Sequence, residues 1–136
     1  MSTIKRFEDL ECWQEARKLV KLIYSAIKAN PEFQKDFRLV SQYTAAGVSV
    51  MNNIAEGWAA QSNAEFIRFL RYSRRSGAET QNCSYVALDQ DYFSQATFQE
   101  LYDQALKTIK IIDGLLRYLR TQRSKPSKRS ERPKRT

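Results

Sequence analysis

The stretch that most constrains the fold of this chain is residues 66–75, where large apolar side chains are interleaved with four arginines. Four residues recur at i, i+3, i+4 and i+7, which is the spacing of one buried stripe on an α-helix, while three of the arginines recur on another face. The stretch therefore predicts a helix with one packing side and one positively charged side. The predicted packing stripe consists of Phe66, Phe69, Leu70 and Ser73, and the predicted basic face consists of Arg68, Arg71, Arg74 and Arg75.

Two further large side chains, Ile67 and Tyr72, lie outside that stripe. Because they widen the apolar arc beyond what one bundle core needs, part of the arc is predicted to contact another subunit. The basic face has a simpler alternative interpretation, in which it is only a solvated side of the helix.

Helix signals dominate the rest of the chain as well. The 136 residues include only four glycines and three prolines, and no alternating strand pattern bounded by turns persists anywhere. The apolar spacing predicts an all-α chain with helices over residues 9–29, 36–59, 62–91 and 94–119. Because long helices joined by short connections must be antiparallel neighbours, the sequence predicts an up-down-up-down four-helix bundle.

The ends of these helices carry their own signals. Asp9 is the predicted N-cap of the first helix, and Asn30 followed by proline ends that helix. Ser62-x-x-Glu65 is a capping box that starts the third helix, and Ser94 caps the fourth. The predicted inward positions are Leu10, Trp13, Val20, Ile23 and Ile27 in the first helix, Phe37, Val40, Tyr43, Gly47, Val50 or Met51 and Ile54 in the second, and Phe98, Leu101, Ala105, Ile109, Ile112, Leu116 and Leu119 in the fourth.

The net charge of +8 is concentrated at the end of the chain. Residues 121–136 contain seven basic residues against Glu131 alone, a net charge of +6, and they contain no large apolar side chain. Such a stretch cannot bury enough surface to offset the entropy of ordering, so we predict a bundle domain over residues 1–120 and a disordered basic tail over 121–136. Basic tails neutralise phosphates, which makes nucleic acid the natural partner, although a tail that only aids solubility is the alternative. Its basic residues are Arg123, Lys125, Lys128, Arg129, Arg132, Lys134 and Arg135.

Candidate catalytic groups are scarce in this sequence. There is no histidine, and Cys12 and Cys83 are far apart, so two buried thiols are expected rather than a zinc site or a disulfide framework. Glu56 and Glu79 lie on helices predicted to be neighbours, but a di-iron bundle needs Glu-x-x-His pairs. These two carboxylates are instead expected to accept hydrogen bonds, from Asn53, Gln42 or an arginine, that fix the helix register.

Other function classes are also disfavoured. The chain has no glycine-rich phosphate loop and no serine or cysteine with a recognisable base, so we expect no enzymatic activity, no cofactor and no metal. No apolar run approaches the ~18 residues that a membrane span needs, and no apolar signal segment follows Met1. A cytoplasmic location is therefore expected, with no membrane partner.

Several blocks of the sequence resemble the four-helix bundle proteins that are encoded in intervening sequences of bacterial 23S ribosomal RNA genes. The resemblance covers about residues 7–119, and Asn53-Ile54-Ala55-Glu56-Gly57 followed by the Glu-Phe and Phe-Leu pairs is its most specific part. This chain has Thr44-Ala45 where relatives commonly show two arginines, and Arg75-Ser76 where they commonly show Gly-Ser, which indicates that positive charge has moved to the third helix. The remaining matching blocks are Phe7-Glu8-Asp9-Leu10 with Trp13 and Ala16, Ser41-Gln42, Val48-Ser49-Val50, Ser62 with Glu65-Phe66-Ile67-Arg68-Phe69-Leu70, and Glu79.

The resemblance implies a small cytoplasmic bundle, typically a ring-shaped homopentamer, without known enzymatic activity. It also implies kinship with the accessory proteins of diversity-generating retroelements, which are basic pentameric bundles that work with a reverse transcriptase and its template RNA. In such a bundle Asn53, Glu56, Gly57 and Glu79 are expected to be structural motif residues.

Charge and resemblance together lead to one main hypothesis, a noncatalytic homo-oligomer that binds RNA through its basic face and tail. The alternative is a protein-interaction adaptor that docks on an acidic partner such as a reverse transcriptase. Trp13 and Trp58 are expected to be packing residues, with a subunit contact of Trp58 or stacking on RNA bases as the alternatives.

Overall fold

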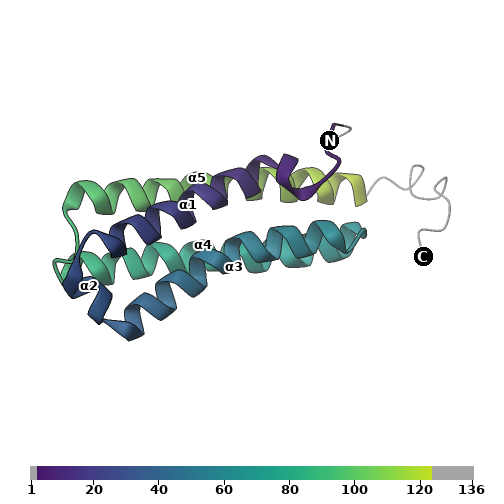
Figure 1. Ribbon diagram of the computed structural model, residues 1–136. Helices are drawn as coiled ribbons and strands as arrows, with labels where there is room; N and C mark the ends of the chain where they lie inside the picture. The colour runs from purple at the N-terminus through teal and green to yellow at the C-terminus, as the bar shows by residue number, and fades with distance from the viewer. Residues whose placement is uncertain (1–2, 124–136) are drawn as a thin grey trace.

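The structure is a computed structural model that describes residues 3–123. Four long antiparallel helices form an elongated bundle within this range, and a short helix caps one end (Figure 1). The all-α, up-down-up-down four-helix bundle predicted from the sequence is therefore confirmed. None of the helices in the described range is long and apolar enough to cross a membrane. The elements are η1 (Phe7–Asp9), α1 (Glu11–Lys28), α2 (Pro31–Lys35), α3 (Phe37–Ala59), α4 (Asn63–Asp89) and α5 (Gln95–Arg123).

Packing between the helices follows the order of the chain. Helix α3 packs most extensively on α4, α4 packs on α5, and α1 contacts both α3 and α5. Helices α1 and α4 are thus diagonal to each other. The short helix α2 and the α4–α5 connection lie at one end of the bundle, called the α2 end below, while η1 and the last turns of α5 lie at the other (Figure 1).

Two of the three predicted helix caps are confirmed. The Ser62 hydroxyl accepts a hydrogen bond from the Glu65 amide at 3.3 Å, and the Ser94 hydroxyl accepts one from the Thr97 amide at 3.1 Å. The predicted cap at Asp9 is wrong, because this residue belongs to η1 and its carboxylate accepts from the Lys5 amide at 3.0 Å. Helix α1 starts two residues later, without a side-chain cap.

Helix α2 was not predicted, because Asn30 followed by proline was interpreted only as the end of the first helix. In the structure Asn30 also starts a new helix, since its side-chain oxygen accepts from the Glu32 amide at 2.8 Å and the Phe33 amide at 3.3 Å. Proline suits the first helical position, where no amide hydrogen is needed. The helix delivers the fully buried Phe33 ring to the core, where it stacks on Tyr43 and Tyr92.

Most predicted inward positions are buried, in two clusters along the bundle. Trp13, Val20, Val40 and Met51 are only partly buried. Phe37 is the clear error, because 79% of its surface is exposed. The physical reason is that α2 fills the core at this end with Phe33, so the first residue of α3 is left on the outside. The confirmed inward positions are Leu10, Ile23, Ile27, Tyr43, Gly47, Val50, Ile54, Phe98, Leu101, Ala105, Ile109, Ile112, Leu116 and Leu119.

Helix α4 packs as predicted along most of its inner stripe. Phe66, Leu70 and Ser73 are buried, and Phe69 is partly buried. The placement of Ile67 outside the core is wrong, because it is 4% exposed and packs in the core cluster that includes the end of α5.

Helix α5 continues through Arg123, three residues into the segment that was predicted to be a tail. The rest of that segment, and therefore the predicted disorder of the tail, lies outside the described residues. The basic residues concerned are Lys125, Lys128, Arg129, Arg132, Lys134 and Arg135.

Candidate nucleic-acid interface

The outer side of α4 carries the predicted basic face. The Ser62 cap fixes where the helix begins, and the buried stripe fixes how it is rotated, so the four arginines must lie on the side away from the core. All four are exposed. The structure thus brings the predicted cationic residues together on one surface, and they differ in what they already contact.

Arg68 is held by its own helix. Its guanidinium donates to the Glu65 carboxylate at 2.8 and 3.2 Å and to the Tyr72 hydroxyl at 3.0 Å. The hydrogen bonds to Glu65 and then to Tyr72 raise the pKa of Arg68 above its ordinary value. The same guanidinium lies 4.8 Å from the Phe69 ring centroid, which is within cation–π range.

Arg74 reaches across the bundle to α5. Its guanidinium donates to both oxygens of the Asp113 carboxylate, at 2.5 and 3.2 Å, so the contact is a bidentate ion pair between the two helices. The hydrogen bonds and the charge of Asp113 raise the pKa of Arg74. Half of the basic face is therefore neutralised by neighbouring carboxylates.

Arg71 and Arg75 are different, because neither forms an ion pair within residues 3–123. The Arg75 guanidinium lies 5.5 Å from the Tyr72 ring centroid, and that of Arg68 lies 5.4 Å from the same centroid. One aromatic ring thus orients two cations. Arg71 and Arg75 are four residues apart on the helix, so their side chains are neighbours on one exposed stripe.

A fifth cation extends this surface onto α5. Arg117 is exposed and lies one turn beyond Asp113, just as Arg71 lies one turn before Arg74. Because the two helices are antiparallel and joined by the Arg74–Asp113 pair, Arg117 and Arg71 lie on the same side of that pair. Sequence reasoning missed both Arg117 and Asp113, since their roles depend on the register between α4 and α5.

Two of the motif residues, Asn53 and Gly57, lie on α3 near its contact with α4. The Asn53 amide donates to the Ser49 carbonyl at 2.9 Å and to the Ser49 hydroxyl at 3.0 Å, and Ser76 on α4 donates to that hydroxyl at 2.9 Å. The Ser73 hydroxyl donates to the Val50 carbonyl at 2.8 Å. These short polar side chains join the two helices at close range.

Gly57 completes this contact. An added Cβ would lie 2.9 Å from a ring carbon of Phe66 and 2.9 Å from the Cβ of Phe69, so only glycine lets the helices approach this closely. The predicted register role of the two glutamates is wrong. Glu56 and Glu79 are exposed, and neither carboxylate accepts a hydrogen bond from a side chain or amide within the described range.

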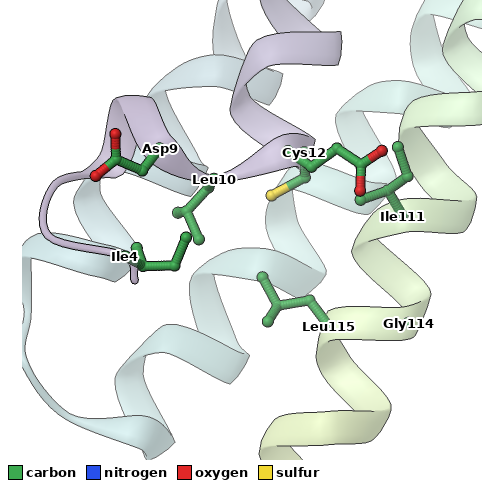
Figure 2. Close-up of a pocket in the computed structure, with 8 residues that line it drawn as sticks. Ile4, Asp9, Leu10, Cys12, Ile111, Gly114 and Leu115 are labelled. Carbon is green, nitrogen blue, oxygen red and sulfur yellow. The ribbon is translucent and has the colours of Figure 1, made fainter. Parts of the chain in front are cut away.

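An open cleft of about 440 Å³ lies between the N-terminal segment and α5 (Figure 2). Burial raises the pKa of the Cys12 thiol in this cleft to about 12, so the sulfur is protonated at neutral pH and is a poor nucleophile. No set of three or more His, Cys, Asp or Glu side chains in residues 3–123 is arranged to hold a metal ion. The cleft is lined by Ile4, Asp9, Leu10, Glu11, Cys12, Ile111, Gly114 and Leu115.

Fold and surface together define a four-helix bundle with a cluster of four exposed arginines on the outer side of α4. Residues 8–114 match the family described as 23S rRNA-intervening sequence protein, so the chain belongs to that family. The chain is also similar to a crystal structure of a protein with unknown function from the S23 ribosomal protein family of Bacteroides thetaiotaomicron. That likeness has a TM-score of 0.71 and 21% identity over 77% of this chain and 97% of the other, and it shows the shared fold. A comparison with curated proteins found no match.

Proposed function

We propose that this protein is a noncatalytic, oligomeric bundle that binds RNA through the basic face of α4 and the basic residues that follow α5. The observation that carries the proposal is the exposed pair Arg71 and Arg75, which form no ion pair within the described residues and lie beside the oriented ring of Tyr72. Membership of a family named after an intervening sequence of 23S rRNA agrees with an RNA-related role.

The expected mechanism is electrostatic. Arg71 and Arg75 each have a guanidinium that is free to donate two hydrogen bonds to one phosphate, and each phosphate that is neutralised releases counterions. The exposed Arg117, on the same side of the Arg74–Asp113 pair as Arg71, would add a further phosphate contact. Several copies of this face in one assembly would engage one RNA at a high effective concentration. Base sequence would contribute little, because the contacts are to the backbone.

Arg68 and Arg74 play a smaller part in this mechanism. Each is paired with a carboxylate, which offsets its charge. A phosphate would therefore be attracted only weakly to either arginine unless its ion pair with Glu65 or Asp113 breaks. Their pairing instead keeps the side chains ordered beside Arg71 and Arg75. The exposed ion pairs contribute little to folding, since such pairs are worth about 0–1 kcal/mol.

A salt titration of single-stranded RNA binding tests the proposal. The intact chain is compared with a form that ends at Arg123 and with the same short form carrying Arg71→Glu and Arg75→Glu. A single strand gives a slope of about −0.7 in log affinity against log salt for each neutralised phosphate. Removing residues after Arg123 is expected to flatten the slope, and reversing the two arginines is expected to abolish the remaining binding.

The matched control reverses two lysines on the diagonal helix, Lys21→Glu and Lys28→Glu, which changes the net charge by the same amount. That variant should retain most of its RNA affinity. Equal losses in both double variants would mean that overall charge, not the α4 surface, attracts RNA. If the intact chain binds no RNA at low salt, the proposal fails, and a protein partner for the basic face, such as a reverse transcriptase, becomes the better explanation.

A further inference from the structure

The most exposed large apolar side chain in the described range is Phe37, with 79% of its surface in solvent. It is held on a rigid corner between α2 and α3 at the α2 end of the bundle (Figure 1). The neighbouring Asp36 carboxylate accepts hydrogen bonds from the Leu39 amide at 3.1 Å and from the Tyr92 hydroxyl at 2.8 Å. Aromatic side chains, including phenylalanine, are enriched in the cores of protein interfaces, so this fixed and exposed ring suits a protein contact.

A pocket of about 410 Å³ opens at the same end of the molecule, between α1 and the start of α5. A cavity of about 150 Å³ is enough to hold benzene, so this pocket has room for a phenyl ring. Its lining includes the apolar side chains Leu22, Ala26 and Phe93, the polar side chains Ser25 and Thr97, and the carboxylate Glu100.

Charge matches the ring to the pocket. Phe37 is followed by the exposed Arg38, which forms no ion pair within residues 3–123, whereas Lys35 is paired with Glu32 at 3.5 Å. The single charged side chain among the residues that line the pocket is Glu100. Insertion of the Phe37 ring into the pocket would therefore bring the Arg38 guanidinium beside this carboxylate. Complementary charges around an apolar anchor favour one docking orientation over others.

Geometry indicates that the contact joins two copies. The ring lies at the start of α3 and the pocket between α1 and α5, so one molecule cannot bring its own ring into its own pocket. Tyr92 links the two features, because its hydroxyl holds Asp36 while its carbonyl accepts from Asn30 at the rim of the pocket. Ring and pocket thus lie at the same level along the bundle, and a rotation about an axis parallel to the helices brings one onto the other.

We propose that Phe37 of one copy inserts into the pocket beside Glu100 of the next copy, as the contact that assembles this protein. Because the two surfaces differ, the contact is head-to-tail and leaves a free ring and a free pocket at the two ends of any open chain. If repeating the rotation brings the last copy back onto the first, the assembly is a closed ring. The inference rests on the oligomeric part of the proposed function and makes no use of the RNA surface.

Two variants that each remove one half of the contact test it in the full chain without RNA. Phe37→Ala removes the anchor, and Ser25→Trp fills the pocket from an exposed helical position. Each variant alone is expected to be monomeric by light scattering after size exclusion, with subunit affinity lowered at least about thirtyfold. Mixed together they are expected to form a one-to-one dimer and nothing larger, because one intact ring and one intact pocket remain. Tyr118→Ala, an exposed aromatic residue near the other end of α5, is the matched control and should assemble like the unmodified protein.

A charge exchange provides a second route that does not touch the apolar contact. Arg38→Glu alone and Glu100→Arg alone should each weaken assembly, and the two changes in one chain should restore it. A monomeric unmodified protein, unchanged assembly in the Phe37 variant, or a mixture that stays monomeric overturns the proposal. A failure of RNA binding can be told apart from a failure of assembly. The Phe37→Ala variant keeps the whole basic face, so its affinity for a short RNA is measured on the monomer, independently of assembly.

Discussion

Gly57 provides the sharpest test of how α3 and α4 are held together. A methyl group at this position would meet Phe66 Cδ1 and Phe69 Cβ at 2.9 Å each, and Phe66 Cα at 3.4 Å. Two of these atoms belong to or adjoin the backbone of α4, so no rotation of a side chain relieves the contact. Gly57→Ala must therefore push α4 away from α3 along the seam that contains Ser49 and Ser76.

The magnitude follows from two opposing terms. Overpacking a core contact costs about 1–3 kcal/mol, and the rigid neighbours place Gly57→Ala near the upper limit. Alanine is favoured over glycine inside a helix by about 1 kcal/mol, which leaves a net loss of about 2 kcal/mol. For a domain of this size that loss lowers the midpoint of thermal unfolding by about 8 °C.

Gly114 is the matched control for Gly57→Ala. A Cβ there has only the Arg117 guanidinium within reach, at 3.8 Å, so Gly114→Ala gains helix propensity without a clash and should raise the midpoint by about 4 °C. Unfolding is followed by circular dichroism at one protein concentration, because assembly makes the midpoint depend on concentration. If Gly57→Ala is as stable as Gly114→Ala, the close α3–α4 contact described above is incorrect.

Three further changes have expected outcomes. Leu70→Ala removes a fully buried side chain and should cost roughly 2–5 kcal/mol in urea unfolding, whereas Arg71→Ala should cost less than about 1 kcal/mol. Asp113→Asn should free Arg74 for a phosphate and steepen the salt slope of RNA binding by about 0.7. Hydrogen bonds and cations hold the pKa of Glu15 below its ordinary 4.5, so its contribution to stability is present above about pH 4.5 and is lost as pH falls further, and Glu15→Gln should flatten that part of the pH–stability curve.

Each of these expectations has a clear contrary result. Equal urea midpoints for the Leu70 and Arg71 variants would mean that α4 is rotated differently about its axis. Asp89→Asn makes the same charge change far from the basic face, so an equal gain in RNA affinity there would show that net charge explains the Asp113 effect. A stability curve for Glu15→Gln that falls as steeply in acid as that of the unmodified protein would exclude this carboxylate as the acid-sensitive group.

The helices were predictable because their signals are local. Ser62 and Ser94 cap the helices they precede, and the buried stripe of α4 follows its sequence spacing almost throughout. Phe37 was misplaced because the same spacing does not reveal that another element fills the core beneath it. Ile67 was misplaced for the converse reason, since the end of α5 widens the buried arc of α4 at that level.

The candidate site was only half predictable. The exposure of all four arginines follows from helical periodicity, which needs no knowledge of the neighbouring helices. Their differing partners do not, because Arg74 is bound by a carboxylate 39 residues away and the pairing depends on the α4–α5 register. The register also determines that Arg117 joins the surface. Charge patterns in sequence thus locate a basic surface, but they do not show which of its cations are free.

The proposed assembly leaves the basic face open in every copy. The contact uses the start of α3 together with the pocket between α1 and α5, and α1 is diagonal to α4 in the bundle. The outer side of α4 therefore takes no part in the contact, while its inner side is fixed to α3 by the close packing at Gly57 and the hydrogen bond from Ser73. Rotation of one copy onto the next would repeat Arg71 and Arg75 at a constant spacing around the assembly. A regular array of rigidly mounted cations suits a long, flexible phosphate backbone, because each contact raises the effective concentration of the next phosphate at the neighbouring copy.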